Sequence, residues 1–468
     1  EECDDGNEIA GDGCNANCQN EQCGNGRVDP GEGCDDGNLT HSDACRNDCI
    51  VARCGDQIVR TDLGEGDDGY EACDDGNDTD TDECRTSCVI AVCGDQVIRT
   101  DLAPGEQGYE NCDDGNQVDD DECSNQCVDL RTHRIVKVIG GRARGILCGL
   151  TARAELRCKA SDNRYGVLGN GTTQNRELPD LIPDLNGVID AAAGVAHVCA
   201  ALESGEVRCW GANYAGQIGD GSVFHRSSPV SVQGLAGATQ LSAGAETTCA
   251  RLEDQTVSCW GGNNSGMLGI GNNDQGHVER RARAVPGITR VRSVHLYNDS
   301  ICAVGMTGFS WCWGNLPYGM HYPGADGPRE ASSPLLLEGV VGVRSASPGY
   351  NFMCLNMATD VTRCWGSNGD GQAGREASDV PVYGPIEITG TLGSTAVATN
   401  RNNGCVIMGN RNVHCWGSGY SHQANPIPNL PNVQSISRFG ERGFCVSKSD
   451  YTVHCWDAGD PPAEVTGW

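Results

Sequence analysis

Seven pairs of cysteines recur through the last two-thirds of the chain, and the two members of every pair are ten positions apart. Six of the seven second cysteines are followed directly by tryptophan, and Lys159 takes that place in the first pair. Successive pairs lie about fifty residues apart, except the last, which follows after forty. A fixed period in this range is typical of solenoids and propellers. The pairs are Cys148/Cys158, Cys199/Cys209, Cys249/Cys259, Cys302/Cys312, Cys354/Cys364, Cys405/Cys415 and Cys445/Cys455.

The residues between the paired cysteines have the pattern of two strands joined by a tight turn. In the second pair the turn falls at Glu203, Ser204 and Gly205, where glycine suits the positive φ that such a loop needs. Folding about this turn makes Cys199 and Cys209 cross-strand neighbours with Cα atoms about 4.5 Å apart, close enough for a disulfide. We therefore predict seven disulfides, one in each hairpin. The alternative is seven pairs of buried free thiols, because cysteine also packs well in cores.

Each hairpin is part of a longer pattern, C-A-L…G-x-V-x-C-W-G-x-N…G-Q-x-G, which is best preserved from His197 to Ser222. An Ala-Gly pair precedes the hairpin, and a proline precedes the closing strand, as at Pro229. The pattern resembles the RCC1-like repeat over about residues 131–468. This resemblance implies an all-β fold, a seven-bladed β-propeller of four-stranded blades. It names no activity, because one propeller scaffold carries many functions. The last two blades depart from the pattern, since Gly-Gln becomes Ser-His-Gln after Trp416 and is lost after Trp456.

Cysteine and negative charge concentrate in residues 1–130, which we call the acidic region. It holds fifteen of the 29 cysteines and 36 Asp and Glu against six Arg, whereas the remainder has 28 acidic and 27 basic residues. The cysteine content argues for an oxidising, extracellular or cell-surface location. The acidic surface argues against nucleic acid as a partner and favours cations. No run of eighteen apolar residues predicts a membrane span, and the absence of a signal peptide before Cys3 indicates a processed or truncated chain.

A second repeat fills the acidic region. The motif Cys-Asp-Asp-Gly-Asn occurs four times, each time followed by cysteines at +11 and +15, and a Cys-Gly pair opens the later units. It resembles the CDDGN-type cysteine-rich repeat common in secreted proteins of myxobacteria and their relatives, and more distantly the Notch-type calcium modules. The motif begins at Cys3, Cys34, Cys73 and Cys112, and the Cys-Gly pairs at Cys23, Cys54 and Cys93. We divide residues 1–130 into units of about 1–22, 23–53, 54–92 and 93–130, ahead of a propeller domain at 131–468.

The acidic region needs cross-links, because its two aromatic residues cannot build a core that offsets chain entropy. Disulfides or a metal supply the stability in small units of this kind. Four cysteines in a unit allow three connectivities, and the sequence does not choose among them. Zinc is excluded by the absence of Cys-x-x-Cys and of nearby histidine. The first unit lacks its opening Cys-Gly, so one of Cys3, Cys14 and Cys18 has lost its partner. Upstream residues were removed, or the thiol pairs with another chain, or it stays free.

Each motif also places oxygen donors at fixed offsets from its first cysteine, acids at +1, +2 and +9 and asparagine at +4. Such hard donors suit Ca²⁺, which takes six to eight oxygen ligands. We therefore predict structural Ca²⁺, and the alternative is turn chemistry alone. The candidate ligands are Asp4, Asp5, Asn7 and Asp12; Asp35, Asp36, Asn38 and Asp43; Asp74, Asp75, Asn77 and Asp82; and Asp113, Asp114, Asn116 and Asp121.

Catalysis has little support in the sequence. Most propeller histidines share no repeat position, and the chain has no Gly-x-Ser-x-Gly, no His-Glu-x-x-His and no phosphate-binding glycine loop in the right context. The nucleotide-exchange activity of the founding RCC1 protein requires a GTPase that a disulfide-rich extracellular chain does not meet. We expect a secreted, non-catalytic structural or adhesive protein with a Ca²⁺-stabilised acidic region. Its partners are proteins, including copies of itself in a filament. The alternatives are a secreted binding or inhibitory module and an unrecognised hydrolase.

Overall fold

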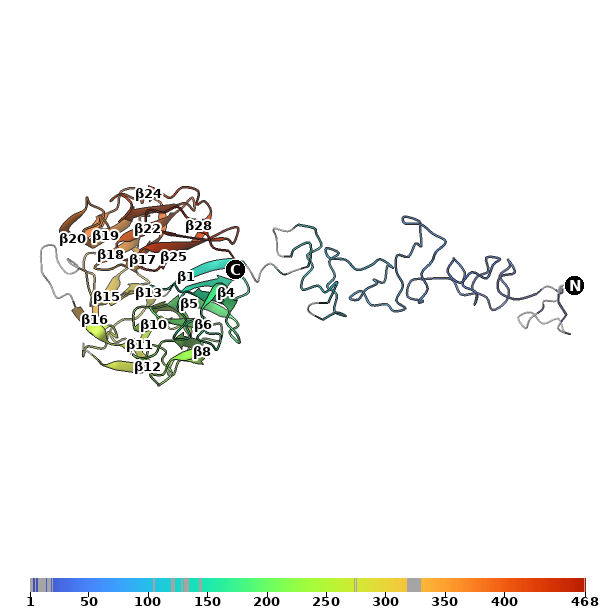
Figure 1. Ribbon diagram of the computed structural model, residues 1–468, viewed down its shortest axis with the longest axis horizontal. Coiled ribbons are helices and arrows are strands. Elements are labelled where there is room, and N and C mark those ends of the chain that lie inside the picture. Colours follow the sequence, from blue (N-terminus) through green and yellow to red (C-terminus); the bar gives the residue numbers. More distant parts are fainter. Residues whose placement is uncertain are drawn as a thin grey trace. The chain divides into compact units, whose positions relative to one another are not determined.

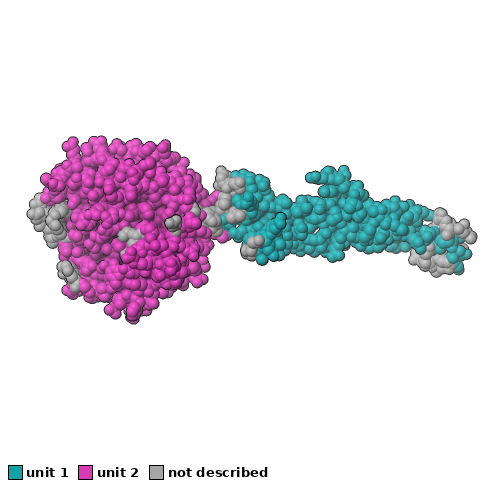
Figure 2. Space-filling model, in the orientation of Figure 1, with its two compact units in different colours: residues 1–131 teal, residues 132–468 magenta. Residues whose placement is uncertain are grey.

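The structure is a computed structural model that divides the chain into two compact units, residues 1–131 and 132–468, shown in different colours in Figure 2. It describes residues 3–4, 6, 14, 18, 20–103, 106–118, 123–127, 129, 134–142, 145–272, 274, 276–317, 330–466 and 468. No helix in these ranges has the length and apolar character needed to cross a bilayer.

The second unit is an all-β, seven-bladed propeller, as the repeat pattern predicted (Figure 1). Every blade is a four-stranded antiparallel sheet whose strands follow one another in chain order. The first three blades are β1 (Ile135–Gly140), β2 (Leu147–Thr151), β3 (Leu156–Ala160) and β4 (Arg176–Leu181); β5 (Val188–Ala193), β6 (His197–Leu202), β7 (Val207–Gly211) and β8 (Arg226–Ser231); and β9 (Ala238–Ala243), β10 (Thr247–Leu252), β11 (Val257–Gly262) and β12 (Val278–Ala284), with the 3₁₀ turn η2 (Asn264–Gly266) before β12.

The other four blades repeat this arrangement. They are β13 (Val291–Tyr297), β14 (Ser300–Gly305), β15 (Ser310–Asn315) and β16 (Glu330–Leu336); β17 (Val343–Pro348), β18 (Phe352–Met357), β19 (Thr362–Asn368) and β20 (Ser378–Glu387); β21 (Ser394–Thr399), β22 (Asn403–Met408), β23 (Val413–Gly417) and β24 (Asn425–Pro426); and β25 (Val433–Phe439), β26 (Gly443–Lys448), β27 (Val453–Asp457) and β28 (Ala463–Glu464).

Burial falls from the second strand of a blade to the fourth. Strand β6 is buried at every position, because its two faces pack against the neighbouring blades, whereas β8 is only partly buried. A mostly apolar segment such as His197–Leu202 is therefore a strand that is covered on both faces. Between β6 and β7, Gly205 has φ +78°, and its amide donates to the carbonyl of Leu202 at 2.8 Å. This turn sets the register in which Cys199 faces Cys209.

The ring closes between the seventh and the first blade. Strand β1 contacts both β25 and β5, so the first strands of the blades neighbour one another around the whole circle. The amides of Val138 and Gly140 donate to the hydroxyls of Ser435 and Ser437 at 3.1 and 2.9 Å. Closure therefore joins segments almost 300 residues apart by side-chain hydrogen bonds between blades.

In five blades the tryptophan that follows the second cysteine donates a hydrogen bond to the blade before it, whereas the indole N–H of Trp365 has no partner among the described residues. The indole N–H of Trp210 donates to the carbonyl of Val167 at 2.9 Å, and that of Trp260 donates to Gln217 at the same distance. Both indoles are completely buried. A Cβ at Gly219 would come within 2.9 Å of the Trp260 ring, so the last glycine of G-Q-x-G makes room for the indole. The repeat motif thus encodes the contact between blades.

The first unit has a different kind of core. Its described residues form turns and isolated bridges such as Cys45↔Val51 and Cys84↔Ile90. The buried apolar side chains are nearly all cysteines, with Cys45 and Cys84 each 3 % exposed. Disulfides therefore take the place that aliphatic side chains have in the propeller.

Candidate functional site

In the propeller, the structure joins the two cysteines of every predicted pair. Their Cα atoms lie 4.1 to 4.2 Å apart, and they occupy directly opposite positions on the second and third strands of a blade. Thirteen of these fourteen cysteines are fully buried, and Cys455 is partly buried. The bonds are Cys148–Cys158, Cys199–Cys209, Cys249–Cys259, Cys302–Cys312, Cys354–Cys364, Cys405–Cys415 and Cys445–Cys455.

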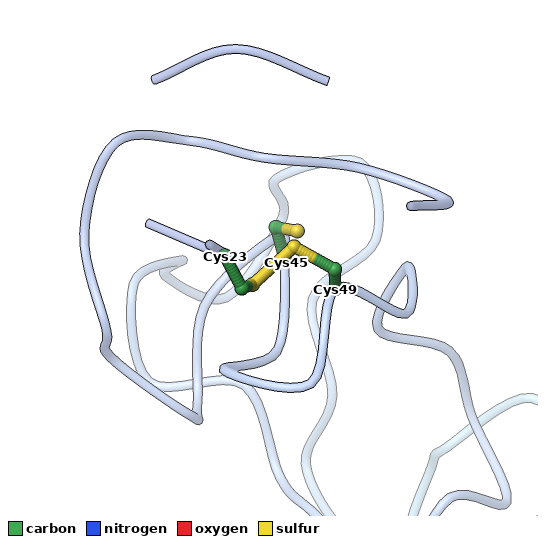
Figure 3. Close-up of side chains that lie close together, drawn as sticks. All are labelled: Cys23, Cys45 and Cys49. Carbon is green, nitrogen blue, oxygen red and sulfur yellow. A yellow bond between two sulfur atoms is a disulfide. The ribbon is translucent and has the colours of Figure 1, made fainter. Parts of the chain in front are cut away.

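In the acidic region, the structure selects one of the three connectivities. The first cysteine of each Cys-Asp-Asp-Gly-Asn motif bonds the cysteine at +11, as in Cys34–Cys45. The cysteine of the opening Cys-Gly pair bonds the cysteine that lies fifteen positions after the first cysteine of the motif, as in Cys23–Cys49. Figure 3 shows this bond beside Cys45. Among the described residues, Cys18 is the free cysteine. It occupies the +15 position of the first unit, whose Cys-Gly partner is missing from the sequence.

The aspartate at +1 of the motif accepts hydrogen bonds from four backbone amides. Asp35 receives the amides of Gly24, Asn25, Gly26 and Gly37 at 2.8 to 3.0 Å. Asp74 and Asp113 repeat the pattern. Burial opposes ionisation, but these amides outweigh it and hold the pKa of Asp35 and Asp113 below the ordinary value. The carboxylate thus fastens the opening Cys-Gly loop to the motif.

The aspartate at +9 has one oxygen bonded and one left open. Asn38 donates its side-chain N–H to Asp43 Oδ2 at 2.9 Å, and Asn77 donates to Asp82 Oδ2 at 3.0 Å. The other oxygen, Oδ1 in both residues, is buried and has no hydrogen-bond partner among the described residues. A buried carboxylate oxygen without a donor is a position that a hard cation fits.

The other predicted ligands that the structure describes are exposed, except Asn116, which is partly buried. Each +2 aspartate accepts the amide of the +4 asparagine, at 3.3 Å for Asp36, 3.2 Å for Asp75 and 3.4 Å for Asp114. In the first unit, Asp4 accepts the amide of Gly6 at 2.9 Å. Asn116 accepts the amide of Val118 at 2.7 Å, as Asn38 and Asn77 accept amides two residues on. The predicted ligands Asp5, Asn7, Asp12 and Asp121 lie outside the described residues.

The described acids that do come together differ from the predicted set. Carboxylates of Glu32 and Asp35, and those of Glu71 and Asp74, lie within 4.8 Å of each other beside a disulfide-bonded cysteine, which is unavailable to a metal. Sequence reasoning missed Glu71, which is 5 % exposed and accepts the amide of Arg60 at 3.0 Å. Burial raises its pKa above the ordinary value. The geometry keeps Asp43 and Asp82 as candidate cation ligands and assigns Asp35, Asp74 and Asp113 to backbone amides.

Aromatic side chains gather on the surface of the first two blades, between the loops that precede β4 and β8. The rings of Tyr165 and Tyr214 lie 4.8 and 6.4 Å from that of His225, edge to face in both cases. Tyr214 is 49 % exposed, and Phe224 beside His225 is 71 % exposed. We call Tyr165, Tyr214, Phe224 and His225 the aromatic cluster. Its members occupy variable positions of the repeat or of the loop that follows it, so a period search does not find it.

Comparison with known proteins supports the propeller assignment. Models of the regulator of chromosome condensation (RCC1) repeat match residues 162–201 and 204–251, and, for a second model, 188–217 and 238–266. No curated protein matches the chain. Prp20p from Saccharomyces cerevisiae has 16% sequence identity and a TM-score of 0.58, over 72% of this chain and 90% of that one. The structure of yeast RCC1 (Prp20) bound to Kap60 has 17% sequence identity and a TM-score of 0.56, over 65% of this chain and 82% of that one.

Human WBSCR16 gives 18% identity and a TM-score of 0.54, over 65% of this chain and 92% of that one. At these identities the likeness to solved structures establishes the fold. Together with the repeat matches, it shows that the chain carries an RCC1-repeat seven-bladed β-propeller, preceded by a cysteine-rich, disulfide-bonded region.

Proposed function

We propose that this protein is a secreted or cell-surface, non-catalytic structural or adhesive protein whose propeller binds other proteins, copies of itself included. The aromatic cluster is the observation that carries the proposal. Exposed aromatic side chains supply large contact areas at little cost in conformational entropy, and they are enriched at the centres of protein interfaces. RCC1 propellers are known to bind proteins, since yeast RCC1 has been crystallised bound to Kap60.

The disulfides support an extracellular location. Twenty-eight of the 29 cysteines are bonded, and such bonds persist in oxidising compartments rather than in the cytosol. The resemblance of the Cys-Asp-Asp-Gly-Asn motif to repeats of secreted bacterial proteins points the same way. The same environment makes the nuclear chemistry of RCC1 an unsuitable analogy for this chain.

Charge supports an assembly in which the acidic region of one copy contacts the next copy. The acidic region has a net charge of about −30 and repels other copies of itself at low salt, whereas the propeller is close to neutral. A head-to-tail contact is heterologous, and it propagates into a filament unless it closes into a ring. We propose that Ca²⁺ damps the repulsion and stabilises the acidic region, with Asp43 and Asp82 among its ligands.

Assembly is tested by light scattering and electron microscopy of the purified full chain at physiological salt, with and without Ca²⁺. We expect polymers in Ca²⁺ that dissociate in EDTA. The double variant Tyr214→Ala/Phe224→Ala should assemble less, and Leu392→Ala, which removes another strongly exposed apolar side chain, should assemble as the wild type does. A monodisperse monomer under all these conditions would refute self-assembly and favour a secreted binding or inhibitory module.

Calcium binding is tested separately by calorimetry. The double variant Asp43→Asn/Asp82→Asn removes both open carboxylate oxygens and should lower the affinity at least tenfold. Glu65→Gln/Asp68→Asn, which changes two exposed acids outside the motif, is the matched control for the loss of two charges. Absence of binding at millimolar Ca²⁺ would leave the motif as turn chemistry alone. Equal affinity in the double variant and the control would remove Asp43 and Asp82 from the ligand set.

A further inference from the structure

A cavity lies between the fifth and sixth blades of the propeller. Its volume is about 540 Å³, within the range of ~300–1,000 Å³ that small-ligand sites occupy. The fifth blade contributes the turn between β17 and β18, the loop after β19, and strand β20. The sixth blade contributes the turn between β21 and β22. Two neighbouring blades therefore build the cavity, and its wall is mostly polar, with two aromatic rings.

The two aromatic rings of the wall are those of Tyr350 and Tyr383, which are 39 % and 40 % exposed. Tyr350 occupies the turn between the first two strands of its blade, at the position that Val195 holds in the second blade and Arg401 in the sixth. The repeat therefore does not require a tyrosine there. Tyr383 shares one face of β20 with Asp379 and Pro381, because alternate residues of a strand point to the same side.

Several polar side chains of the wall have hydrogen-bonding groups that the protein leaves unused. The carbonyl of Asn351 accepts the amide of Ser367 at 2.8 Å, and that of Asn402 accepts the amide of Ser418 at 3.2 Å, so both turns are held by their main chains. Their side chains are left for another partner. The side chains without a hydrogen-bond or ion-pair partner among the described residues are those of Asn351, Ser367, Asp379 and Asn402.

Gln372 adds a donor whose position is fixed by the protein. It is 3 % exposed, its Oε1 accepts the amide of Asp370 at 2.9 Å, and its carbonyl accepts the indole N–H of Trp416 at the same distance. The side-chain nitrogen of Gln372 has no hydrogen-bond partner among the described residues and belongs to the cavity wall. A donor held in this way orients a ligand without first having to be ordered itself.

The charges of the wall restrict the ligand further. Arg401 is the single cation among the lining residues, and it is already bonded to Glu441 at 2.7 Å and lies 5.4 Å from the ring centre of Tyr350. Asp379 is the single acid, and it repels negative groups. Phosphate, sulfate and carboxylate ligands therefore find no available positive charge. Pro381 is the one aliphatic side chain of the wall, so the cavity has no apolar recess for the side chains of a peptide.

We propose that this cavity binds a neutral saccharide, which stacks on Tyr383 and Tyr350 and whose hydroxyl groups bond to Asp379, Asn402 and Gln372. Each hydroxyl donates and accepts, so a sugar satisfies carboxylate, amide oxygen and amide nitrogen together. The C–H groups of a sugar ring carry partial positive charge and pack on the negative face of an aromatic ring. This site requires neither the assembly nor the calcium proposed above.

The test is binding of the full-length, non-reduced protein to an array of immobilised oligosaccharides. The array carries neutral di- to tetrasaccharides of hexoses and N-acetylhexosamines, together with sialylated and sulfated forms of the same sugars. We expect binding to a subset of the neutral members, displaced by the same sugar in free form, and weaker binding to the anionic forms. Absence of binding to every neutral member would overturn the proposal, and so would equal or stronger binding to the sulfated forms.

Variants locate the site, with calorimetry on the neutral sugar that binds best. Tyr383→Ala removes one aromatic wall and should weaken the affinity at least tenfold, and Asp379→Asn should weaken it several-fold. Phe309→Ala, which removes a ring that is 43 % exposed outside the cavity, is the control for Tyr383→Ala.

The control for the lost charge is Asp184→Asn, which changes an exposed acid outside the cavity. Tyr383 and Asp379 are both exposed, so we expect their variants to fold, and tryptophan fluorescence checks this. Sugar binding that is unchanged in both folded cavity variants would place the ligand elsewhere and refute the site.

Discussion

His197 should make the stability of the propeller depend on pH. Its side chain on β6 is completely buried, and Nε2 lies 2.9 Å from Thr248 Oγ1 on the next blade. The Thr248 hydroxyl donates its single proton to the carbonyl of Gln217 at 3.1 Å, so it accepts from His197 Nε2–H. Nδ1 is then the unprotonated nitrogen, and it is buried without a partner among the described residues. Protonation would create a buried N–H with no acceptor.

The size of the effect follows from the shift in pKa. Burial lowers the pKa of His197 from 6.5 to about 4, so the unfolded chain binds this proton at a higher pH than the folded chain. Stability is therefore complete above about pH 7 and is lost as the pH falls through 6.5 towards 4. The linkage relation gives a loss of about 2 kcal/mol at pH 5 and about 3 kcal/mol at pH 4 from this one residue.

Denaturant unfolding under non-reducing conditions measures this loss. The free energy of unfolding is determined about every half pH unit between pH 7.5 and 4. All eight tryptophans lie in the propeller, so their fluorescence reports on that unit. His197→Gln keeps a neutral polar group and should be less stable than the wild type at pH 7. The difference between the two should shrink by about 2 kcal/mol at pH 5, because the variant has no proton to bind. Burial also lowers the pKa of His295 to about 4, so this residue adds to the pH dependence of both proteins. Subtracting the unfolding free energy of the variant from that of the wild type removes the contribution of His295.

The control is His422→Gln, which changes a histidine that is only partly buried and should leave the shape of the wild-type curve unchanged. If the free-energy difference between wild type and His197→Gln stays constant from pH 7 to pH 4.5, the reasoning is refuted. That result would mean that the folded protein accommodates the imidazolium, for instance by admitting water to Nδ1.

Three further outcomes are expected. Replacing Cys199 and Cys209 together by alanine should lower the free energy of unfolding by about 2 to 3 kcal/mol through loop entropy. Peptide mapping of the non-reduced wild type should recover the two cysteines linked, and bonds between different blades would contradict this. Trp210→Phe leaves the Val167 carbonyl without its indole donor and should cost about 1 to 3 kcal/mol in denaturant unfolding, beyond the effect of lost volume. Asp74→Asn replaces one of two acceptor oxygens by a donor facing backbone amides, so limited proteolysis of residues 54–92 should accelerate while the propeller is unaffected.

The sequence alone determined the number of blades and the architecture of each. Both are local properties, because the ten-residue step between Cys199 and Cys209 spans a single hairpin and its turn fixes the register. The period of about fifty residues then repeats the blade seven times. The acid at +1 of the Cys-Asp-Asp-Gly-Asn motif shows the limit of this reasoning. Its repeated spacing within the chain predicted a metal ligand and did not predict that Asp35 accepts amides from residues 24 to 26, which lie in the preceding loop.

Only the tertiary structure decided which side chains from different blades meet. The reach of Arg438 to the carbonyls of Leu296 and Ala243 joins residues 142 and 195 positions apart, and no period relates them. The contact of His225 with Tyr165 likewise brings together two loops of variable sequence. These contacts form only when the ring closes, because side chains of different blades meet only after all seven sheets have packed together. Local spacing therefore specifies the hairpins, and the packing of blades against one another creates the aromatic cluster and the cavity between the fifth and sixth blades.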